Sequence, residues 1–382
     1  MSSISSYFPS MGALLAYGTR TLAQAVQETP NPAPTDNKAS IASALKSAFN
    51  KGPSLQPDAS IRSVSITLNN GSGLDIDRFT KLISPSSKPE APLSLRAIEI
   101  NNSATAKTIG KDHGLHSSGV TPVWLENQGS IVGKNGAGVK LEGDKSDVVI
   151  NTGLIAGSTG VALDMGGGND LLVINGGSRF EGAIDGGSGT NQVILDDAKG
   201  GHFNGASQMQ HLWVGTGTWT LTGAVDANQQ GQVYSGATLI NQSHIGGSMT
   251  VDAGGTYMGG TVGNLHVAGT LLLDPATKTQ TRIKNNLQLE KQSSLGFNVG
   301  MGETHSTLKV ANTAALGGAT LNIQVQNESD ELLTRQLRVV DANTIDGQFG
   351  AVTSNLKNLA PELIYTPTAV YVGFKRKETQ AT

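Results

Sequence analysis

Apolar and polar residues alternate along the chain from Ile61 onward, the pattern of half-buried β-strands. Apolar residues recur at about every second position between Ile61 and Leu68 and lead into Asn69-Asn70-Gly71, a sequence typical of a tight turn. After a less regular stretch rich in proline, another strand is predicted over residues 93–100. No amphipathic segment of helical period recurs between the strands, so a fold of alternating strands and helices is disfavoured.

From about Val123 the chain repeats itself at a spacing of roughly 20 to 24 residues. Each unit contains two or three short predicted strands separated by Gly, Asn or Asp, and later units drift but keep the period. The most similar pairs of segments are 127–133 with 151–157, 138–142 with 160–164, 148–151 with 172–175, and the Gly-rich 166–172 with 186–193.

This repeat predicts an all-β fold, a right-handed parallel β-helix with a less regular N-terminal region. One coil of about 22 residues is too short to bury its own apolar side chains, whereas stacked coils bury a continuous column of Val, Ile and Leu. Gly and Asn gather at the corners because those positions need φ above zero. The right hand follows from the rule for parallel crossovers. We expect ~14 coils, which stack to about 65 Å at the usual strand spacing.

Composition divides the chain into further regions. Residues 1–60 are predicted to be a tail or linker rich in Pro, Ser and Ala, with a short helix near 41–49. The apolar run at 11–17, followed by small residues at 23–25, has the form of a degenerate export signal or its remnant. We expect an irregular β region or cap over 61–122, β-helix coils over 123–253 and 254–377, and a tail over 378–382.

Charge and residue usage exclude several classes of protein. The chain holds 27 Lys and Arg against 30 Asp and Glu, and this balance excludes a generally basic surface for nucleic acid. It has no Cys, which excludes disulfides, thiolate metal sites and a thiol nucleophile. Its 49 Gly follow no three-residue period, which excludes collagen.

Several segments, taken in their order along the chain, resemble a known family. They are similar to the passenger domains of bacterial autotransporters, the pertactin-like β-helix proteins, and the resemblance covers about Val123 to Lys377. The segments that carry it are ENQGSIVGKNGAGVKLEG (126–143), GGTYMGGTVGNLHVAGTLLLDP (254–275), LRVVDANTIDGQF (337–349) and YVGFKRK (371–377).

The resemblance implies a non-enzymatic adhesin or host-interaction protein, exported by type V secretion and either exposed on the outer membrane or secreted. In that family the last coils help the passenger fold during export, a role that would fall to residues 254–377. Expected partners are molecules of the host cell surface or extracellular matrix and, through exposed coil edges, further copies of the chain. Family members continue into an outer-membrane β-barrel translocator, which would be a partner outside this chain.

The expected binding loops are the segments that break the repeat, 107–120 and 202–210. We predict no catalytic, cofactor-binding or metal-binding residues. Neither a Gly-Asp-Ser-Gly sequence nor a Gly-x-Ser-x-Gly nucleophile elbow is evident, so a serine hydrolase is disfavoured.

A secreted β-helix polysaccharide lyase or hydrolase is the alternative function. Asp196-Asp197, Gly201-His202 and Arg282-Ile283-Lys284 superficially resemble a polygalacturonase site, where paired carboxylates flank a water molecule. The first two pairs lie closer than one coil, so we expect a polar turn and a strand start instead. Such an enzyme should carry carboxylates with Arg or Lys in a line across three adjacent coils, and no such line is visible in the sequence.

Two further patterns could bind metal. The runs 166–170 and 186–191 approach the nonapeptide of calcium-binding β-rolls, but they are not in tandem, so corner turns are preferred and weak calcium binding stays open. His113 and His116 have metal-ligand spacing but no carboxylate nearby beyond Asp112, so a solvated loop is expected. The three tryptophans are expected in the core or in a cap, at positions 124, 213 and 219.

Overall fold

The computed structural model describes residues 64–77, 97–226, 229–277 and 279–377. The predicted export signal, linker and short helix within 1–60, and the tail at 378–382, lie outside these residues. The chain divides into two compact units, one up to Asn191 and the other from Gln192 onward. No helix in the described ranges is long and apolar enough to span a membrane.

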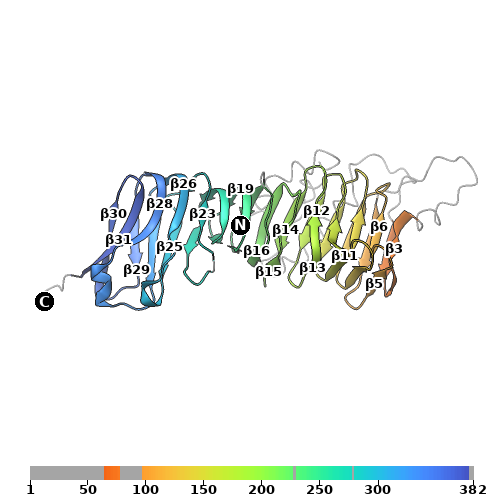
Figure 1. The fold of residues 1–382 in the computed structure, drawn as a ribbon, viewed down its shortest axis with the longest axis horizontal. Coiled ribbons are helices and arrows are strands. Elements are labelled where there is room, and N and C mark those ends of the chain that lie inside the picture. The colour runs from red at the N-terminus through yellow and green to blue at the C-terminus, as the bar shows by residue number, and fades with distance from the viewer. Residues whose placement is uncertain (1–63, 78–96, 227–228, 278, 378–382) are drawn as a thin grey trace, which may run out of the picture. The chain divides into compact units, whose positions relative to one another are not determined.

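The first unit consists of two stacks of parallel strands, coloured orange to yellow-green in Figure 1. Strand β11 is long enough to pair with β8 and β9 at once. The first stack contains β1 (Val64–Leu68), β4 (Ile98–Asn102), β7 (Val123–Asn127), β10 (Val148–Asn151) and β12 (Leu171–Ile174). The second contains β2 (Gly71–Ser72), β3 (Leu74–Asp75), β5 (Lys107–Gly110), β6 (Leu115–Ser117), β8 (Ser130–Gly133), β9 (Val139–Leu141), β11 (Leu154–Asp164) and β13 (Arg179–Asp185).

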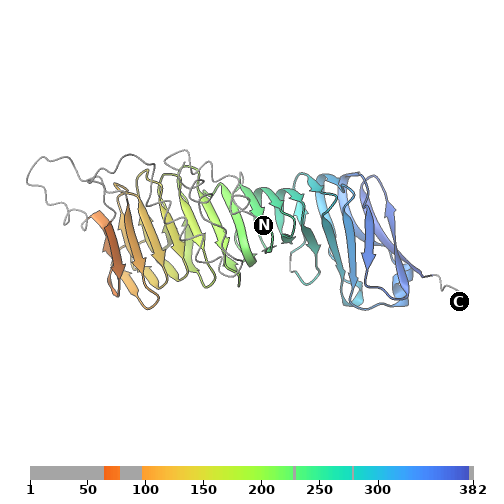
Figure 2. The same ribbon diagram turned by 180° about the vertical axis from the view of Figure 1, so that it is seen from behind.

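The second unit, seen from behind in Figure 2, also has two parallel stacks, and β16 takes part in both. The first contains β14 (Gln192–Asp196), β16 (His211–Leu221), β17 (Gln230–Val233), β19 (His244–Val251), β21 (Thr261–Val267), β23 (Arg282–Ile283), β24 (Leu287–Leu289), β26 (Leu308–Ala315) and β28 (Leu337–Asp346). The second adds β15 (Gly201–Phe203), β18 (Ala237–Asn241), β20 (Thr256–Met258), β22 (Thr270–Leu273), β25 (Ser294–Val299), β27 (Thr320–Val325) and β29 (Ala351–Ser354).

The parallel stacking of the second unit ends in an antiparallel segment. Strands β30 (Leu359–Tyr365) and β31 (Ala369–Arg376) form a hairpin, and β31 pairs antiparallel with β28. Two short 3-10 helices, η3 (Met301–Glu303) and η4 (Asp330–Thr334), lie in the connections between coils. The hairpin therefore pairs one edge of the last parallel strand with the chain itself.

Register aligns like residues on neighbouring coils, and this alignment builds the core. Ile100, Leu125, Val149 and Leu172 are register partners along the first stack, and each is at most 1% exposed. The second unit has an equivalent column of fully buried residues on β18, β20, β22, β25 and β27: Leu239, Tyr257, Leu271, Leu295 and Leu321. The predicted parallel β-helix and its apolar column are confirmed.

The coils differ from the prediction in length and in starting point. Ser248 pairs with Asn264 across a short coil, whereas Lys309 pairs with Asp341, a partner about twice as far along the chain. The longer coils carry the extra residues in connections such as η4, outside the paired strands. Parallel coils also begin before Val123, because β1 and β4 already pair in register.

Candidate functional site

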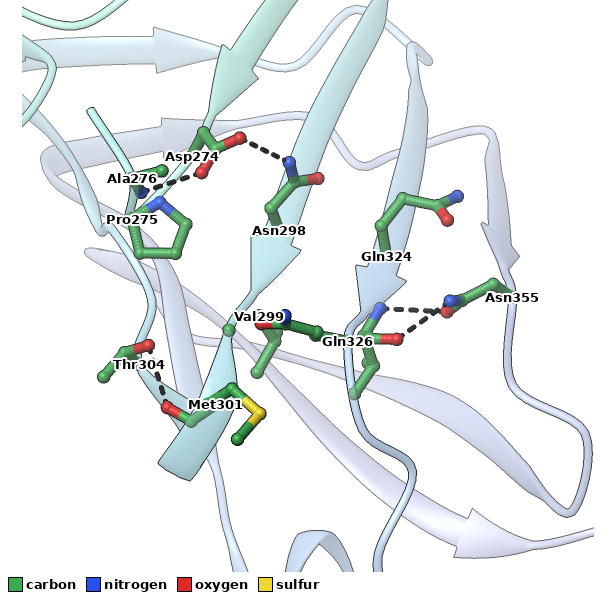
Figure 3. A pocket seen from close by; sticks show the side chains of 12 residues that line it. Asp274, Pro275, Ala276, Asn298, Val299, Met301, Thr304, Gln324, Gln326 and Asn355 are labelled. Atoms are coloured by element: carbon green, nitrogen blue, oxygen red, sulfur yellow. Dashed lines mark hydrogen bonds between the residues drawn. The ribbon is translucent and has the colours of Figure 1, made fainter.

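A groove with a volume of about 580 Å³ crosses the ends of β22, β25 and β27 in the second unit (Figure 3). Polar side chains from successive coils line one side of it, and Asn298 and Gln324 are register partners. Pro275 and Met301 contribute apolar surface. The polar lining residues with carboxylate or amide groups are Asp274, Asn298, Gln324, Gln326 and Asn355.

Hydrogen bonds fix part of this groove, which we call the amide groove. The Asn298 amide donates to Asp274 at 2.9 Å, and the other Asp274 oxygen accepts the Ala276 N–H at 2.8 Å. Asn355 both donates to and accepts from the Val325 backbone at 2.9 Å. Gln324 and Gln326 are exposed, so their side chains are accessible to a ligand.

A second groove, of about 530 Å³, lies on the other stack of the same unit. Thr261, Arg282, Lys309 and Asp341 are register partners on β21, β23, β26 and β28 and line it together. They point outward, because the residues that follow them are at most 7% exposed: Val262, Ile283, Val310 and Ala342. This outward row, with Lys284, is the cationic column. The column is a row of basic residues on adjacent coils that the sequence did not reveal, but it holds one carboxylate, Asp341, where the expected enzyme would carry several.

The charges of the cationic column do not cancel. Asp341 is engaged by Arg338, whose Nη1 lies 3.2 Å from Oδ1 of Asp341. Lys284 Nζ lies 3.3 Å from Nε2 of His244. Burial, and secondarily the Lys284 charge, lower the pKa of His244, so a neutral imidazole accepts from the ammonium. In the described part of the chain, Arg282 and Lys309 have no carboxylate within ion-pair distance.

A cluster in the first unit contradicts the expectation that His113 and His116 are remote from carboxylates. Asp75 and His116 are register partners on β3 and β6, and ligand atoms of Asp75, Asp77 and His116 lie within 4.8 Å of one another. Carboxylate oxygen and imidazole nitrogen are ligands for divalent transition metals. However, Asp77 already accepts the Ser118 N–H and hydroxyl at 2.9 to 3.3 Å.

The surroundings of the histidine pair are also ordered by contacts. The His113 and His116 rings stack with centroids 5.5 Å apart, and His113 Nδ1 accepts the Ala137 N–H at 3.0 Å. Burial lowers the pKa of His113, with further contributions from His116 and Lys140. His116 lies on β6, so the predicted solvated loop is wrong for this residue.

The residues that resemble a polygalacturonase site are dispersed. Asp196, at the end of β14, accepts a hydrogen bond from the Thr216 hydroxyl at 2.7 Å. Asp197 is buried, and its Oδ1 accepts a hydrogen bond from the Lys199 N–H. His202 lies on β15, in the other stack. Four strands, β16, β17, β19 and β21, separate β14 from Arg282 on β23. The carboxylates and the basic residues therefore do not meet.

The two Gly-rich runs are stacked corners, as the sequence favours. Gly167 and Ser188 form a parallel bridge, and Gly166 and Gly187 both have φ near +70°, at 75° and 71°. The Asp170 side chain is 0% exposed and accepts the Asp147 N–H at 2.7 Å. It points into a buried column and not toward a shared surface ion.

The predicted binding loops are only partly loops. Segment 107–120 contains β5 and β6, and segment 202–210 begins on β15 and then runs without strand to β16. The tryptophans are core residues as expected, with exposures of 1% for Trp124, 6% for Trp213 and 0% for Trp219.

Sequence comparisons with models of protein families and with curated proteins found no match. The function therefore has to be argued from the grooves themselves. Neither groove is predicted by the sequence pattern, although Arg282 and Lys284 belong to one of the motifs considered above. The alternation of apolar and polar residues indicates that the polar lining residues point outward. It does not show which of them share a column, because the coils differ in length.

Proposed function

We propose that this chain is a non-enzymatic glycan-binding protein, an adhesin built on a parallel β-helix. The observation that carries the proposal is the amide groove, in which Asp274, Asn298 and Gln324 follow one another on successive coils. Sugar hydroxyls donate and accept hydrogen bonds, and amide side chains offer both functions while a carboxylate offers acceptors. A concave site with a few placed polar groups is the usual form of a ligand site.

The spacing of the groove also favours a chain-like ligand. Neighbouring strands lie about 4.8 Å apart, a distance comparable with one pyranose unit, so successive coils can contact successive sugars. Pro275 and Met301 offer apolar surface to the C–H faces of the sugar rings. Met301 is 68% exposed, so a ligand can cover it.

Binding is favoured over cleavage by the number of carboxylates. Hydrolysis of glycosides ordinarily uses two carboxyl groups on either side of the scissile bond. Among the residues that line the amide groove, Asp274 is the one acidic residue, and Asn298 and Ala276 hold both of its oxygens. This arrangement suits a hydrogen-bond acceptor that orients a ligand.

The resemblance to autotransporter passengers supplies the proposed setting. In that setting the chain is exposed on the bacterial surface or secreted, with an outer-membrane translocator as its export partner. Its ligands are glycans of host cells or the extracellular matrix. Residues 254–377, which include the amide groove, would also assist folding during export.

An array of immobilised neutral and acidic glycans, probed with the labelled full chain, tests the proposal. We expect selective binding, and Gln324→Ala with Gln326→Ala should weaken the binding of neutral glycans at least about tenfold. Gln242→Ala with Gln348→Ala removes two other exposed amides and should leave binding unchanged. Absence of binding, or equal loss in both double variants, would contradict the proposal. Release of shortened or unsaturated sugars would instead support the lyase or hydrolase.

A further inference from the structure

The second groove of the C-terminal unit concentrates positive charge that nothing within the described residues neutralises. Its wall contains Arg282, Lys284 and Lys309, whereas its one acidic residue, Asp341, is paired with Arg338. The whole chain has a formal net charge of −3, so this concentration is local. A local cluster of cations in a concave site attracts and holds anions.

Register makes the cluster a line instead of a scattered patch. Arg282 and Lys309 are direct partners on neighbouring parallel strands, and Thr261 and Asp341 extend the row to either side. The row runs along the direction in which the coils stack, with about 4.8 Å between strands. A ligand that follows it must be extended and must carry negative charge at a similar interval.

The column is held in place from both ends. Arg338 bridges Asp341 and the Tyr371 hydroxyl, at 3.2 and 2.5 Å, and its guanidinium lies over the Tyr371 ring at 5.1 Å. At the other end, His244 accepts a hydrogen bond from Lys284 at 3.3 Å. These contacts orient Lys284 and Asp341 without adding negative charge to the groove.

We propose that the cationic column binds an acidic polysaccharide, with Arg282, Lys284 and Lys309 contacting carboxylate or sulfate groups of successive sugar units. Arg282 can take a carboxylate in a two-pronged contact, and the two lysines act as point charges. The site lies on different strands from the amide groove, and its proposed ligand is a charged class of glycan. It can therefore exist even if the amide groove binds nothing.

The lining of the groove argues against nucleic acid as the occupant. Proteins that bind single-stranded nucleic acid combine positive charge with aromatic side chains on which bases stack. The residues lining this groove include no aromatic side chain: Thr261, Arg282, Ile283, Lys284, Lys309, Val310, Ala311, Asp341 and Ala342. Short aliphatic groups and cations suit a narrow, unstacked polyanion.

Calorimetric titration of the full chain with a polygalacturonate oligomer tests this proposal. Three charge contacts predict that log affinity falls with log salt at a slope of about −2.1 to −2.7, so affinity should fall roughly 20- to 40-fold between about 50 and 200 mM NaCl. Arg282→Gln with Lys309→Gln should weaken binding at low salt at least about tenfold. That variant should retain only about threefold salt dependence, because one contact remains.

The matched control is Lys199→Gln with Lys291→Gln, which removes two exposed lysines outside the groove. It should bind polygalacturonate as the parent does. Equal weakening in the control, no polygalacturonate binding, or tighter binding of a thymidine oligonucleotide of equal charge would each overturn the proposal. Retained binding in the Arg282→Gln, Lys309→Gln variant would also overturn it. Loss of neutral-glycan binding on the array concerns only the amide groove.

Discussion

Replacing Asp170 by Asn should stabilise the first unit at neutral pH and leave its stability almost unchanged in acid. Asp170 and Asp147 belong to a buried column in which each side chain accepts a backbone N–H of the preceding coil. Asp147 accepts the Val123 N–H at 2.7 Å, and Asp170 accepts the Asp147 N–H at 2.7 Å. Asn191 continues the column by accepting the Asp170 N–H at 2.9 Å.

Asn191 shows why an amide suits this column better than a carboxylate. Its Nδ2 donates to the carbonyl oxygens of Gly186 and Gly187 at 2.7 and 3.2 Å. The second oxygens of Asp147 and Asp170 are buried and have no hydrogen-bond partner in the structure. Burial raises the pKa of Asp147 to about 8 and that of Asp170 to about 9.

The sign and size of the effect follow from these pKa values. Both carboxyls are protonated in the folded state and ionised in the unfolded state between about pH 4 and pH 8. The contribution of these two carboxyls to stability is therefore fully present below about pH 4, and it is lost as the pH rises toward their pKa values in the folded state. At pH 7 the loss in the free energy of unfolding due to Asp170 reaches about 4 kcal/mol. This is about 1.36 kcal/mol for each of the roughly three pH units between the pKa of an unfolded Asp and pH 7. Asparagine does not ionise and recovers up to that amount.

Urea unfolding of the full chain at pH 4 and pH 7.5, followed by tryptophan fluorescence, measures the effect. Trp124 adjoins Val123 in the first unit, whereas the other two tryptophans lie in the second, so the Trp124 contribution to the signal follows the first unit. Asp144→Asn removes an exposed carboxyl on the coil of Asp147 and should change stability by less than about 0.5 kcal/mol. An Asp170→Asn urea midpoint that matches the parent at pH 7.5, or that rises equally at both pH values, would mean that Asp170 ionisation does not limit stability.

Three further changes test the core and the corners by urea unfolding. Asn127→Ala should lower the free energy of unfolding by about 2–4 kcal/mol. The fully buried Asn127 side chain accepts a hydrogen bond from the Asn102 amide at 2.7 Å and donates one to Asn151 on the next coil. Leu295→Ala, at 0% exposure, should cost about 2–5 kcal/mol, whereas the 38% exposed Val352→Ala should cost far less. Gly187→Ala should cost more than about 3 kcal/mol, since its Cβ would lie 1.6 Å from Gly166 O. Gly160→Ala, with open space, should cost about 1–2 kcal/mol.

The sequence was sufficient for the features that depend on short-range repetition. The repeat of residues 148–151 at 172–175 predicts buried apolar residues such as Val149 and Leu172, and the Gly-rich runs predict the corners at Gly166 and Gly187. These features depend on residues within one coil and its immediate copy. The first coils escaped detection because residues between β3 and β4 break the period.

The grooves could not be predicted because they depend on register between coils of unequal length. Arg282, Lys309 and Asp341 share a column, although more residues separate Lys309 from Asp341 along the chain than separate Arg282 from Lys309. A constant period, as the repeat suggests, places them on different faces. Asp75 and His116 meet although the irregular, proline-rich stretch separates them along the chain. Coil length is set by connections that lie outside the strands, and their contribution is not visible in strand periodicity.

Affinity capture of a mixed pool of oligosaccharides on the immobilised full chain, followed by mass spectrometry, shows whether the second unit binds glycans without cutting them. We expect retention of intact oligosaccharides. The variant Arg282→Gln with Lys309→Gln should lose the acidic ones, and Gln324→Ala with Gln326→Ala should lose the neutral ones. Retention of nothing, or recovery of shortened or unsaturated sugars, would contradict this expectation.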